Sequence, residues 1–243
     1  MRCSVMIRCT AALLSLVSVS TSSTVAAQLR PNASNATCPK DWLYGPNKTL
    51  QFRMEYSSGK RVLVGDGGVD DFAANHLDAA IRQYQPIDEI WLRSPGGNSE
   101  QGTELGYVIR RWGIPTRVPA GWGCASACTM AFLGGSIRTI DPGGVYAVHM
   151  FTVVGGERYK EMIESERTKG NVYNMLDALQ KREQDGALTA TGQNDYIIKM
   201  GVSRKLLSEV IYPQLQKNYS GEKGSTIYCM NSEELRRYNV INN

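Results

Sequence analysis

The sequence predicts an α/β fold in which helices cover a mostly parallel sheet. Short β-branched or apolar runs at 61–64, 89–92 and 145–149 have the length and composition of strands. Helix-periodic stretches follow the first two runs, and glycine-rich turns separate the segments. Because βα crossovers bring the ends of parallel strands to one edge of a sheet, we expect a ligand site at that edge.

The first βα unit follows a polar stretch. Residues 28–60 are rich in Asn, Ser, Pro and Gly, so we expect an exposed lead-in with one strand at 50–54. After the run at 61–64, the turn at 65–68 leads into an amphipathic helix. Its predicted buried face comprises Phe72, Leu77, Ala80, Ile81 and Tyr84. The turn lacks G-x-G-x-x-G and a Walker lysine, so we interpret it as a tight turn and not as a phosphate loop.

The next units lead to a serine. The strand at 89–92 ends in the Ser-Pro-Gly-Gly turn at 94–97. A helix follows, and its buried stripe is Leu105, Val108, Ile109 and Trp112. After a third short strand at 116–119, the turn at 121–123 leads through Cys-Ala-Ser-Ala-Cys into an apolar helix that begins near Ser126.

The remaining chain is expected to complete the sheet and cover it. Strands are predicted at 137–140 and 145–149, and helices within 156–183, at 204–212 and at 232–238. The helices of 156–183 would cover one face of the sheet or form an interface. Ser203 and Ser232 are the expected start signals of the last two helices.

The first 27 residues have the three parts of a secretory signal peptide. Arg2 and Arg8 make a basic start, residues 11–19 are apolar, and Val-Ala-Ala at 25–27 supplies the small residues of a cleavage site. The apolar part is shorter than the about 20 residues that a membrane helix needs. We therefore expect a periplasmic or secreted chain without stable membrane insertion, whose residues 61–243 form a single domain.

Composition and charge exclude few partners. The 42% of hydrophobic residues is ordinary for a globular protein with a core. Loss of residues 1–27 removes two arginines and no acidic residue, so the net charge falls from +4 to +2. That charge is too weak and too scattered to indicate a nucleic-acid partner.

Four cysteines remain after the signal peptide: Cys38, Cys124, Cys128 and Cys229. In an exported protein an even number favours two disulfides, for which three pairings exist. Zinc is the rival ligand, but the spacing lacks paired Cys-x-x-Cys motifs, and the two histidines lie far from the cysteines in sequence. We expect no metal.

One of the three pairings is favoured by position. Cys38 and Cys229 lie near the two ends of the mature domain, and chain ends are often close in space. Cys124 and Cys128 bracket Ser126, and a helical i, i+4 pair lies about 6 Å apart at Cα, within reach of a bridge. Such a bridge would stiffen the turn that holds the serine.

Ser126 and His149 have the properties of a serine nucleophile and its base. A serine hydroxyl needs a base to take its proton, and the oxyanion formed on attack needs N–H donors aimed at it. Histidine exchanges a proton readily near neutral pH, and this one ends a strand. The expected donors are Ala127, at the helix start, and the glycines Gly96 and Gly97, whose backbone can approach a substrate closely. Singly, each motif is more often a packing feature; together they favour an acyl-transfer site.

These motifs resemble those of the Clp protease proteolytic subunit and its relatives in the crotonase-like superfamily. The likeness covers about residues 61–151, with a weaker one near the C-terminus. In that family a Ser-Pro-Gly-Gly turn supplies an oxyanion donor, an Ala-Ser segment opening a helix carries the nucleophile, and a strand-borne histidine is the base. The resemblance implies a fold of repeated ββα and βα units and a serine peptidase. The Cys-Ala-Ser-Ala-Cys variant behind a signal peptide is most similar to an exported bacterial branch.

The sequence departs from that family at the third member of the triad. The family has an Asp before a segment like residues 228–235, where this chain has Ser225 and Thr226. A hydroxyl or carbonyl could still orient the imidazole, but loss of the carboxylate costs about 10⁴ in turnover where a triad depends on it. The candidate substitutes are Asp177, Asp185 and Asp195.

We therefore expect an exported serine hydrolase, in the first place a peptidase, that needs no cofactor and acts on a peptide or protein; a homo-oligomer is left open. The alternative from another class is a binding or scaffold protein of the same fold that has lost its activity. An acyl-CoA hydratase or isomerase is a third interpretation, but an exported protein has little access to CoA. A Ser/Lys dyad with Lys169 or Lys181 would leave His149 idle.

Overall fold

A computed structural model describes residues 31–32, 35–39, 47–149, 161, 164–165, 167–170, 172–213 and 227–243. The expected signal peptide lies outside this part of the chain. Five strands form the main sheet in the order β3-β4-β5-β6-β8. Their bounds are Gln51–Ser57, Lys60–Asp66, Glu89–Arg93, Thr116–Val118 and Arg138–Ile140.

The main sheet is parallel except at one edge. Neighbouring strands from β4 to β8 run parallel, whereas β3 pairs antiparallel with β4 along its whole length. Val62, Leu63 and Val64 in β4 are fully buried, as expected of a strand that is covered on both faces. The predicted α/β fold with a mostly parallel sheet is therefore confirmed.

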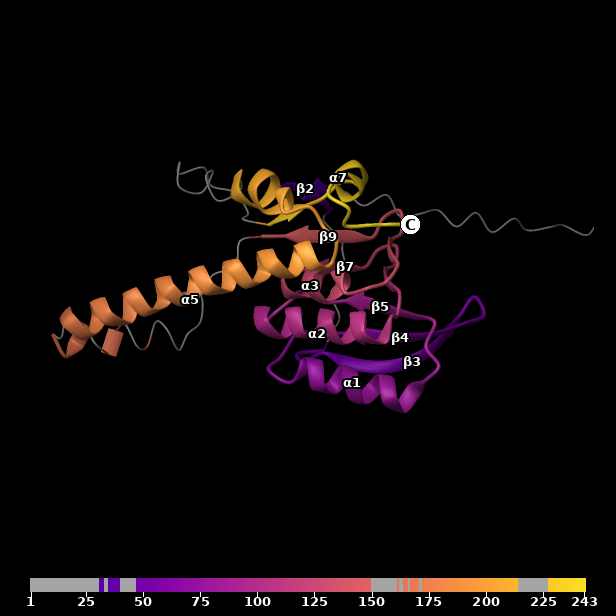
Figure 1. Ribbon diagram of the computed structural model, residues 1–243, viewed down its shortest axis with the longest axis horizontal. Coiled ribbons are helices and arrows are strands. Elements are labelled where there is room, and N and C mark those ends of the chain that lie inside the picture. The colour runs from indigo at the N-terminus through magenta and orange to yellow at the C-terminus, as the bar shows by residue number, and fades with distance from the viewer. Residues whose placement is uncertain are drawn as a thin grey trace, which may run out of the picture.

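Three helices lie side by side against this sheet in the order α1, α2, α3 (Figure 1). They span Ala73–Tyr84, Ser99–Trp112 and Ala127–Leu133. In the predicted stripe of α1, Leu77, Ala80 and Ile81 are buried and Tyr84 is half-buried. Phe72, which precedes the helix, is 63% exposed. The side chain of Asn98 caps α2 by accepting the N–H of Gln101, and Gly113 ends the helix at φ 66°.

Helices α2 and α3 touch backbone to backbone. A Cβ on Gly102 of α2 would lie 2.4 Å from the carbonyl oxygen of Ala127, far inside contact distance. Likewise, a Cβ on Gly134 would lie 2.2 Å from the oxygen of Gly106. Glycine at these positions therefore sets how closely α3, which follows Ser126, can pack on α2.

A smaller sheet carries the strand before Ser126. It has the order β10-β9-β7, with bounds Tyr228–Cys229, Val145–Val148 and Gly123–Ala125. β7 and β9 run parallel, and Ala125 is the Cα partner of Ala147. An isolated bridge between Ser94 and Cys124 joins this sheet to the end of β5. The ends of β5, β7 and β9 thus lie next to one another.

Two disulfides are present, and they are the pairs that the sequence favoured. Cys38 in β2 (Asn35–Pro39), which pairs with β1 (Pro31–Asn32), is bonded to Cys229 in β10, and Cys124 is bonded to Cys128. The hydroxyl of Thr37 accepts the N–H of Cys229 at 3.1 Å. The first bridge therefore ties the N-terminal strand to the C-terminal one.

The structure differs from the expected exposed lead-in over 28–60. The strand predicted at 50–54 runs instead as β3 from Gln51 to Ser57 and forms an edge of the main sheet. Leu50 and Cys38 are 2% and 3% exposed. Polar composition is typical of a loop, but Leu50 packs into the main core and Cys38 is bonded to Cys229.

The C-terminal part contains a long helix and two short ones. α5 spans Val172–Lys199, the π-helix η1 spans Leu206–Ile211, and α7 spans Ser232–Arg237. Asn231, and not Ser232, caps α7, in a capping box with Glu234. Ser203 accepts the N–H of Lys205 just before η1. Among the described helices, none is both long and apolar enough to cross a membrane.

Arg138 joins the C-terminal segment to the sheet. It is 1% exposed, and its guanidinium donates to the carbonyl oxygens of Val240 at 2.7 Å, Asn239 at 2.9 Å and Met200 at 3.2 Å. Burial lowers the pKa of this guanidinium, as does the nearby charge of Arg110. Arginine stays protonated, so its guanidinium N–H groups remain available to these buried carbonyl oxygens.

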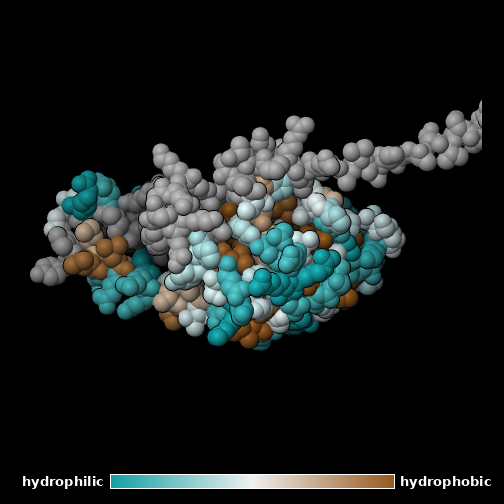
Figure 2. Space-filling view, turned by 90° about the horizontal axis from the view of Figure 1, so that it is seen from above, coloured by the Kyte–Doolittle hydropathy of each residue, from teal (hydrophilic) through white to brown (hydrophobic). Residues whose placement is uncertain are grey.

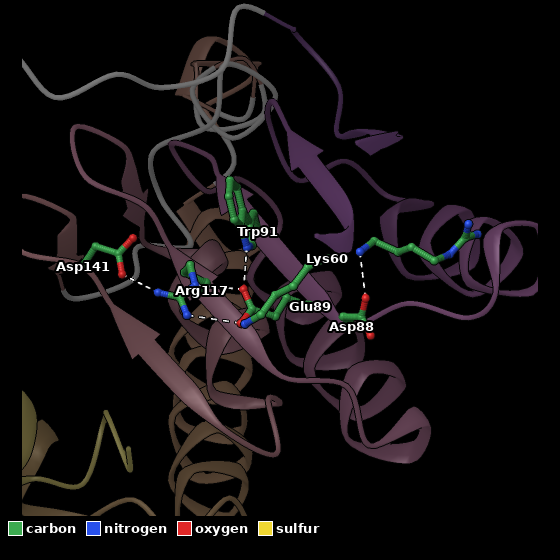
Figure 3. Close-up of polar contacts among 7 residues, drawn as sticks. Lys60, Asp88, Glu89, Trp91, Arg117 and Asp141 are labelled. Atoms are coloured by element: carbon green, nitrogen blue, oxygen red, sulfur yellow. Dashed lines mark hydrogen bonds and ion pairs between the residues drawn. The ribbon is translucent and has the colours of Figure 1, made fainter. Parts of the chain in front are cut away.

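Glu89 is the centre of a polar network at the start of β5 (Figure 3). Its carboxylate accepts from Lys60 at 2.5 Å, Trp91 at 2.8 Å and Arg117 at 2.9 Å, and Arg117 also binds Asp141. Burial opposes the charged form of Glu89, but these three donors together hold its pKa at about 2. Glu89 begins β5, whereas Ser94, which binds the serine turn, follows the other end of this strand. The network therefore lies at the end of β5 away from Ser126.

Candidate active site

Ser126 has an unusual backbone conformation. It lies between β7 and α3 with φ 55° and ψ −125°. Only two other non-glycine residues in the described chain have positive φ, Ser58 and Asn239. A side chain at such torsions strains the backbone, and strain of this kind is concentrated at functional sites. A serine on a sharp turn from strand to helix is also how some hydrolases expose their nucleophile.

Ser126 is the accessible point of a buried segment. Every other residue from 123 to 135 is buried, whereas Ser126 is half-buried. Its N–H donates to the oxygen of Ala147 at 3.0 Å, and its carbonyl accepts the N–H of Thr129 at 2.8 Å. The N–H of the preceding Ala125 donates to Ser94 at 3.0 Å. The turn is thus fixed to β9, to α3 and to the end of β5.

His149 follows β9 directly and comes to the same place. Because β7 and β9 are parallel with Ala125 opposite Ala147, the residues that follow each strand leave the same edge of the small sheet. Ser126 and His149 line one cavity of about 30 Å³. The cavity is completed by Ser99, Ala127, Thr129, Met130, Val148, Gln193, Leu207 and Ile211. The structure therefore brings the two predicted catalytic residues together.

The Ser-Pro-Gly-Gly turn lies against the serine turn. A Cβ on Gly96 would lie 2.5 Å from the Cβ of Ser126 and 2.9 Å from the nitrogen of Ala127. Gly96 and Gly97 have φ 93° and 146°, which side chains rarely adopt. The turn can approach Ser126 this closely only because it has no side chain.

Of the three expected oxyanion donors, Gly97 and Ala127 differ from Gly96 in their hydrogen bonds. The N–H of Gly96 donates to the hydroxyl of Ser94 at 3.1 Å, so it is already used. On either side of Gly97, the oxygen of Gly96 and the N–H of Asn98 both bind Val69 at 2.8 Å. Since successive peptide groups alternate in direction along an extended segment, the N–H of Gly97 points away from Val69. Within the described residues, no hydrogen bond uses the N–H of Gly97 or Ala127.

The hydroxyls of two buried tyrosines bind the short helix α3. Tyr196 donates to the carbonyl oxygen of Met130 at 2.7 Å, and Tyr146 donates to that of Thr129 at 3.5 Å. Burial raises the pKa of both hydroxyls, so they remain protonated donors. Arg110 donates to the oxygens of Leu133 and Gly135 at the other end. α3 has only seven residues, so these side chains keep it, and with it the turn at Ser126, in place.

Among the described residues, the acidic candidates for the third triad member do not line the cavity. Ser225 and Thr226 lie outside the described residues. Asp185 lines a wider groove between α2 and α5, and Asp177 and Asp195 are exposed on α5. None of the described residues that line the Ser126 cavity is a carboxylate. The alternative lysines, Lys169 and Lys181, are exposed and do not line it either.

The cysteines are oxidised in pairs, so they supply no thiolates to a metal. In the part of the chain that the structure describes, no group of three His, Cys, Asp or Glu side chains could hold a metal ion. The described lining of the cavity offers the hydroxyl of Ser126, the imidazole of His149 and backbone N–H groups.

The structure resembles a number of solved structures. One of them is that of a ClpP1 mutant from Listeria monocytogenes, with a TM-score of 0.49, 15% sequence identity and coverage of 74% of this chain and 88% of that chain. No family model and no curated protein matches the sequence. The case for the site consequently rests on its own geometry.

The structure reveals site features that sequence reasoning missed. The strain at Ser126 and the contact of Gly96 with Ser126 depend on how distant segments pack. No sequence pattern singles out Tyr196, yet its hydroxyl binds α3 across 66 residues of sequence. Gln193, Leu207 and Ile211 line the cavity although nothing local marks them. For these packing features the sequence offers one signal, the small residues on both sides of Ser126, which allow close contact.

Proposed function

We propose that this chain is a serine hydrolase that cleaves peptide bonds outside the cytoplasm. The strained turn that presents Ser126 to a cavity shared with His149 is the observation that carries the proposal. Strain at an accessible hydroxyl, in a segment otherwise buried, is expected where function requires it. The two disulfides fit an oxidising compartment.

The reaction would proceed in two acyl-transfer steps. His149 takes the proton of Ser126 as its oxygen attacks the substrate carbonyl carbon. The N–H groups of Gly97 and Ala127 stabilise the negative oxygen of the tetrahedral intermediate. His149 then gives the proton to the leaving amine, and an acyl-serine remains. Water, activated by the same imidazole, attacks the ester and releases the acid and the free serine.

Two neighbouring cavities indicate how a substrate would lie. The cavity at Ser126 holds about 30 Å³, and Met130, Leu207 and Ile211 are apolar parts of its lining. Ser99 and Gln193 also line the groove between α2 and α5, which has about 490 Å³. A small side chain next to the scissile bond would enter the first cavity, while the rest of an extended peptide would follow the groove.

Labelling with a fluorophosphonate probe tests the nucleophile. The probe reacts with activated serines, so intact-mass analysis of the chain should show one adduct, and peptide mapping should place it at Ser126. Ser126→Ala should remove the adduct. Ser208→Ala is the matched control, because Ser208 is exposed on η1 and does not line the cavity at Ser126. No adduct on the wild-type chain, or an adduct that survives Ser126→Ala, would show that the hydrolase proposal is wrong.

The second candidate is a binding protein of the same fold without activity. It is favoured by one observation, that no described residue lining the cavity is a carboxylate that could orient His149. Loss of that carboxylate costs about 10⁴ in turnover where a triad depends on it. A wild-type chain that binds a peptide in the groove without labelling or cleavage would identify this function.

The sequence left a homo-oligomer open, and we propose that a second copy of the chain packs on α5. α5 extends away from the body of the molecule, and hydrophobic atoms lie among hydrophilic ones at its projecting end (Figures 1 and 2). Leu176 and Leu179 of this helix are 55% and 43% exposed. Sedimentation velocity on the wild-type chain and on Leu176→Glu tests self-association, which the substitution should weaken. A wild-type chain that sediments as a monomer at all concentrations would exclude it.

A further inference from the structure

The Cys124–Cys128 bridge encloses the proposed nucleophile and one proposed oxyanion donor. It joins β7 to the first turn of α3, with Cα atoms 5.3 Å apart, and the enclosed residues are Ala125, Ser126 and Ala127. Both cysteines are buried, at 0% and 1% exposure. The torsions that direct the Ser126 hydroxyl and the Ala127 N–H therefore belong to a closed ring.

The turn at Ser126 needs such a constraint. Its φ of 55° is unfavourable for a residue with a Cβ, so an unconstrained chain would relax towards negative φ. That change would turn the hydroxyl away from the cavity shared with His149 and re-aim the N–H of Ala127. Backbone strain of this kind is large enough to shift a two-state population about tenfold or more.

The hydrogen bonds of the turn do not enforce the strained state alone. The N–H of Ser126 is bound to Ala147 at 3.0 Å and its oxygen to the N–H of Thr129 at 2.8 Å. These bonds attach Ser126 itself to β9 and to α3. The disulfide joins Cys124 and Cys128, which lie two residues before and two residues after Ser126, and the ring it closes is too short to accommodate many alternative turns.

The two bridges of this protein differ in what they can stabilise. The stabilisation that a disulfide gives the whole fold grows with the length of the loop that it closes. Cys38 and Cys229 are 191 residues apart, whereas Cys124 and Cys128 are only 4 apart. The long loop therefore contributes most to the stability of the fold. The short loop contributes less, so its main effect is on local geometry.

We infer that the Cys124–Cys128 disulfide positions Ser126 and Ala127 for reaction, and that reduction of this bridge turns the site off. The inference rests on the proposed hydrolase function. Reduction by a dithiol transfers two electrons and two protons: the S–S bond breaks, both cysteines become thiols, and the dithiol becomes a disulfide. The site is then inactive in a reducing compartment, where thiols stay reduced, and becomes competent when the bridge forms in an oxidising one.

Two double variants of the same chain separate the two bridges. In Cys124→Ala/Cys128→Ala we expect the rate of fluorophosphonate labelling at Ser126 to fall about tenfold or more, with a small change in melting temperature. In Cys38→Ala/Cys229→Ala we expect the larger fall in melting temperature, because the bridge that closes the long loop is removed. The rate of labelling at Ser126 should stay within about twofold of wild type. Equal labelling rates in the first variant and the wild type would overturn the inference.

Reduction of the wild-type chain is the reversible version of the test. Because both sulfurs are buried, dithiothreitol reaches the bridge only when the turn opens, so labelling should decline slowly with incubation and return on reoxidation. The variant Cys38→Ala/Cys229→Ala, which retains only the short bridge, should show the same decline and return. Labelling that does not respond to verified reduction of the short bridge would overturn the inference.

Hydrogen exchange measures the turn without any reaction. In Cys124→Ala/Cys128→Ala the N–H groups of Ser126 and Thr129 should exchange about tenfold faster or more. The N–H of Ile90, bound to Pro115 at 2.8 Å in the main sheet, should be unchanged. If the wild-type chain fails to label, the hydrolase proposal is wrong. The inference about the disulfide is then wrong as well, because there is no reactivity for the bridge to control. If it labels and neither labelling nor exchange changes in the variant, only the inference is wrong.

Discussion

Gly96 lies directly against Ser126. A Cβ on Gly96 would stand 2.5 Å from the Cβ of Ser126, closer than such atoms ever approach, and 2.6 Å from the oxygen of Ala125. Two turns that are 30 residues apart in sequence are therefore fitted to each other at the cavity. The position of the serine depends on the absence of a side chain at Gly96.

Gly96→Ala should displace the serine turn. The new methyl group must move Ser126 or the peptide after Ala125, and alanine at φ 93° adds backbone strain. We expect probe labelling to fall by about 10² and the free energy of unfolding to fall by about 1–3 kcal/mol. Gly59→Ala is the matched control, because Gly59 has φ 79° but open space around its Cα. The Gly59→Ala variant should lose stability and keep its labelling rate. Equal losses of labelling in both variants would show that the contact between Gly96 and Ser126 does not position the serine.

Ser126 and His149 should behave as one unit in kinetics. Ser126→Ala and His149→Ala should each lower hydrolysis of a small ester by at least about 10³, and the double variant should be no worse than either single one. His76→Ala should leave the rate unchanged, since His76 is exposed on α1 and lines a different pocket. Additive losses in the double variant would mean that the two residues act independently.

The sequence predicts those elements of the fold whose burial pattern lies within their own residues. Alternation of β-branched runs with periodic stretches located β4, β5, α1 and α2, because each of these elements buries its own stripe. The sequence predicts β3 only as part of a lead-in, because the residues of this strand are exposed or half-buried and its strand structure comes from pairing with β4. Polar sequence at an edge strand resembles a loop.

The candidate site could be predicted only in its components. Ser126 and His149 were visible through their motifs, and the structure brings them to one cavity. The donors that hold α3 were not visible, because Tyr196 and Arg110 reach it from other elements. No local pattern reports such contacts, since they arise from packing of segments far apart in sequence.

Arg138 should be essential for stability. Arg138→Met keeps much of the volume but removes every donor, so the carbonyls of Val240, Asn239 and Met200 lose their partner in a buried place. We expect the free energy of unfolding to fall by about 3 kcal/mol or more in urea. Arg236→Met, on the exposed face of α7, should change it by less than about 0.5 kcal/mol. Similar losses in both variants would show that the buried hydrogen bonds are not the cause.

Glu89 should make the stability of the fold depend on acid pH. Lys60, Arg117 and Trp91 hold its pKa at about 2 in the folded chain, against 4.5 for an ordinary glutamate. A depressed pKa stabilises the fold above the unfolded value, and this stabilisation is lost as pH falls from about 4.5 towards 2. Glu89→Gln should therefore melt well below wild type at pH 6, and the difference between the two melting temperatures should shrink steadily between pH 4.5 and 2. Because the carboxylate of Asp78 also has a pKa of about 2, only the difference between the two chains isolates Glu89. A difference that stays constant over that range would show that the charge of Glu89 does not contribute to stability.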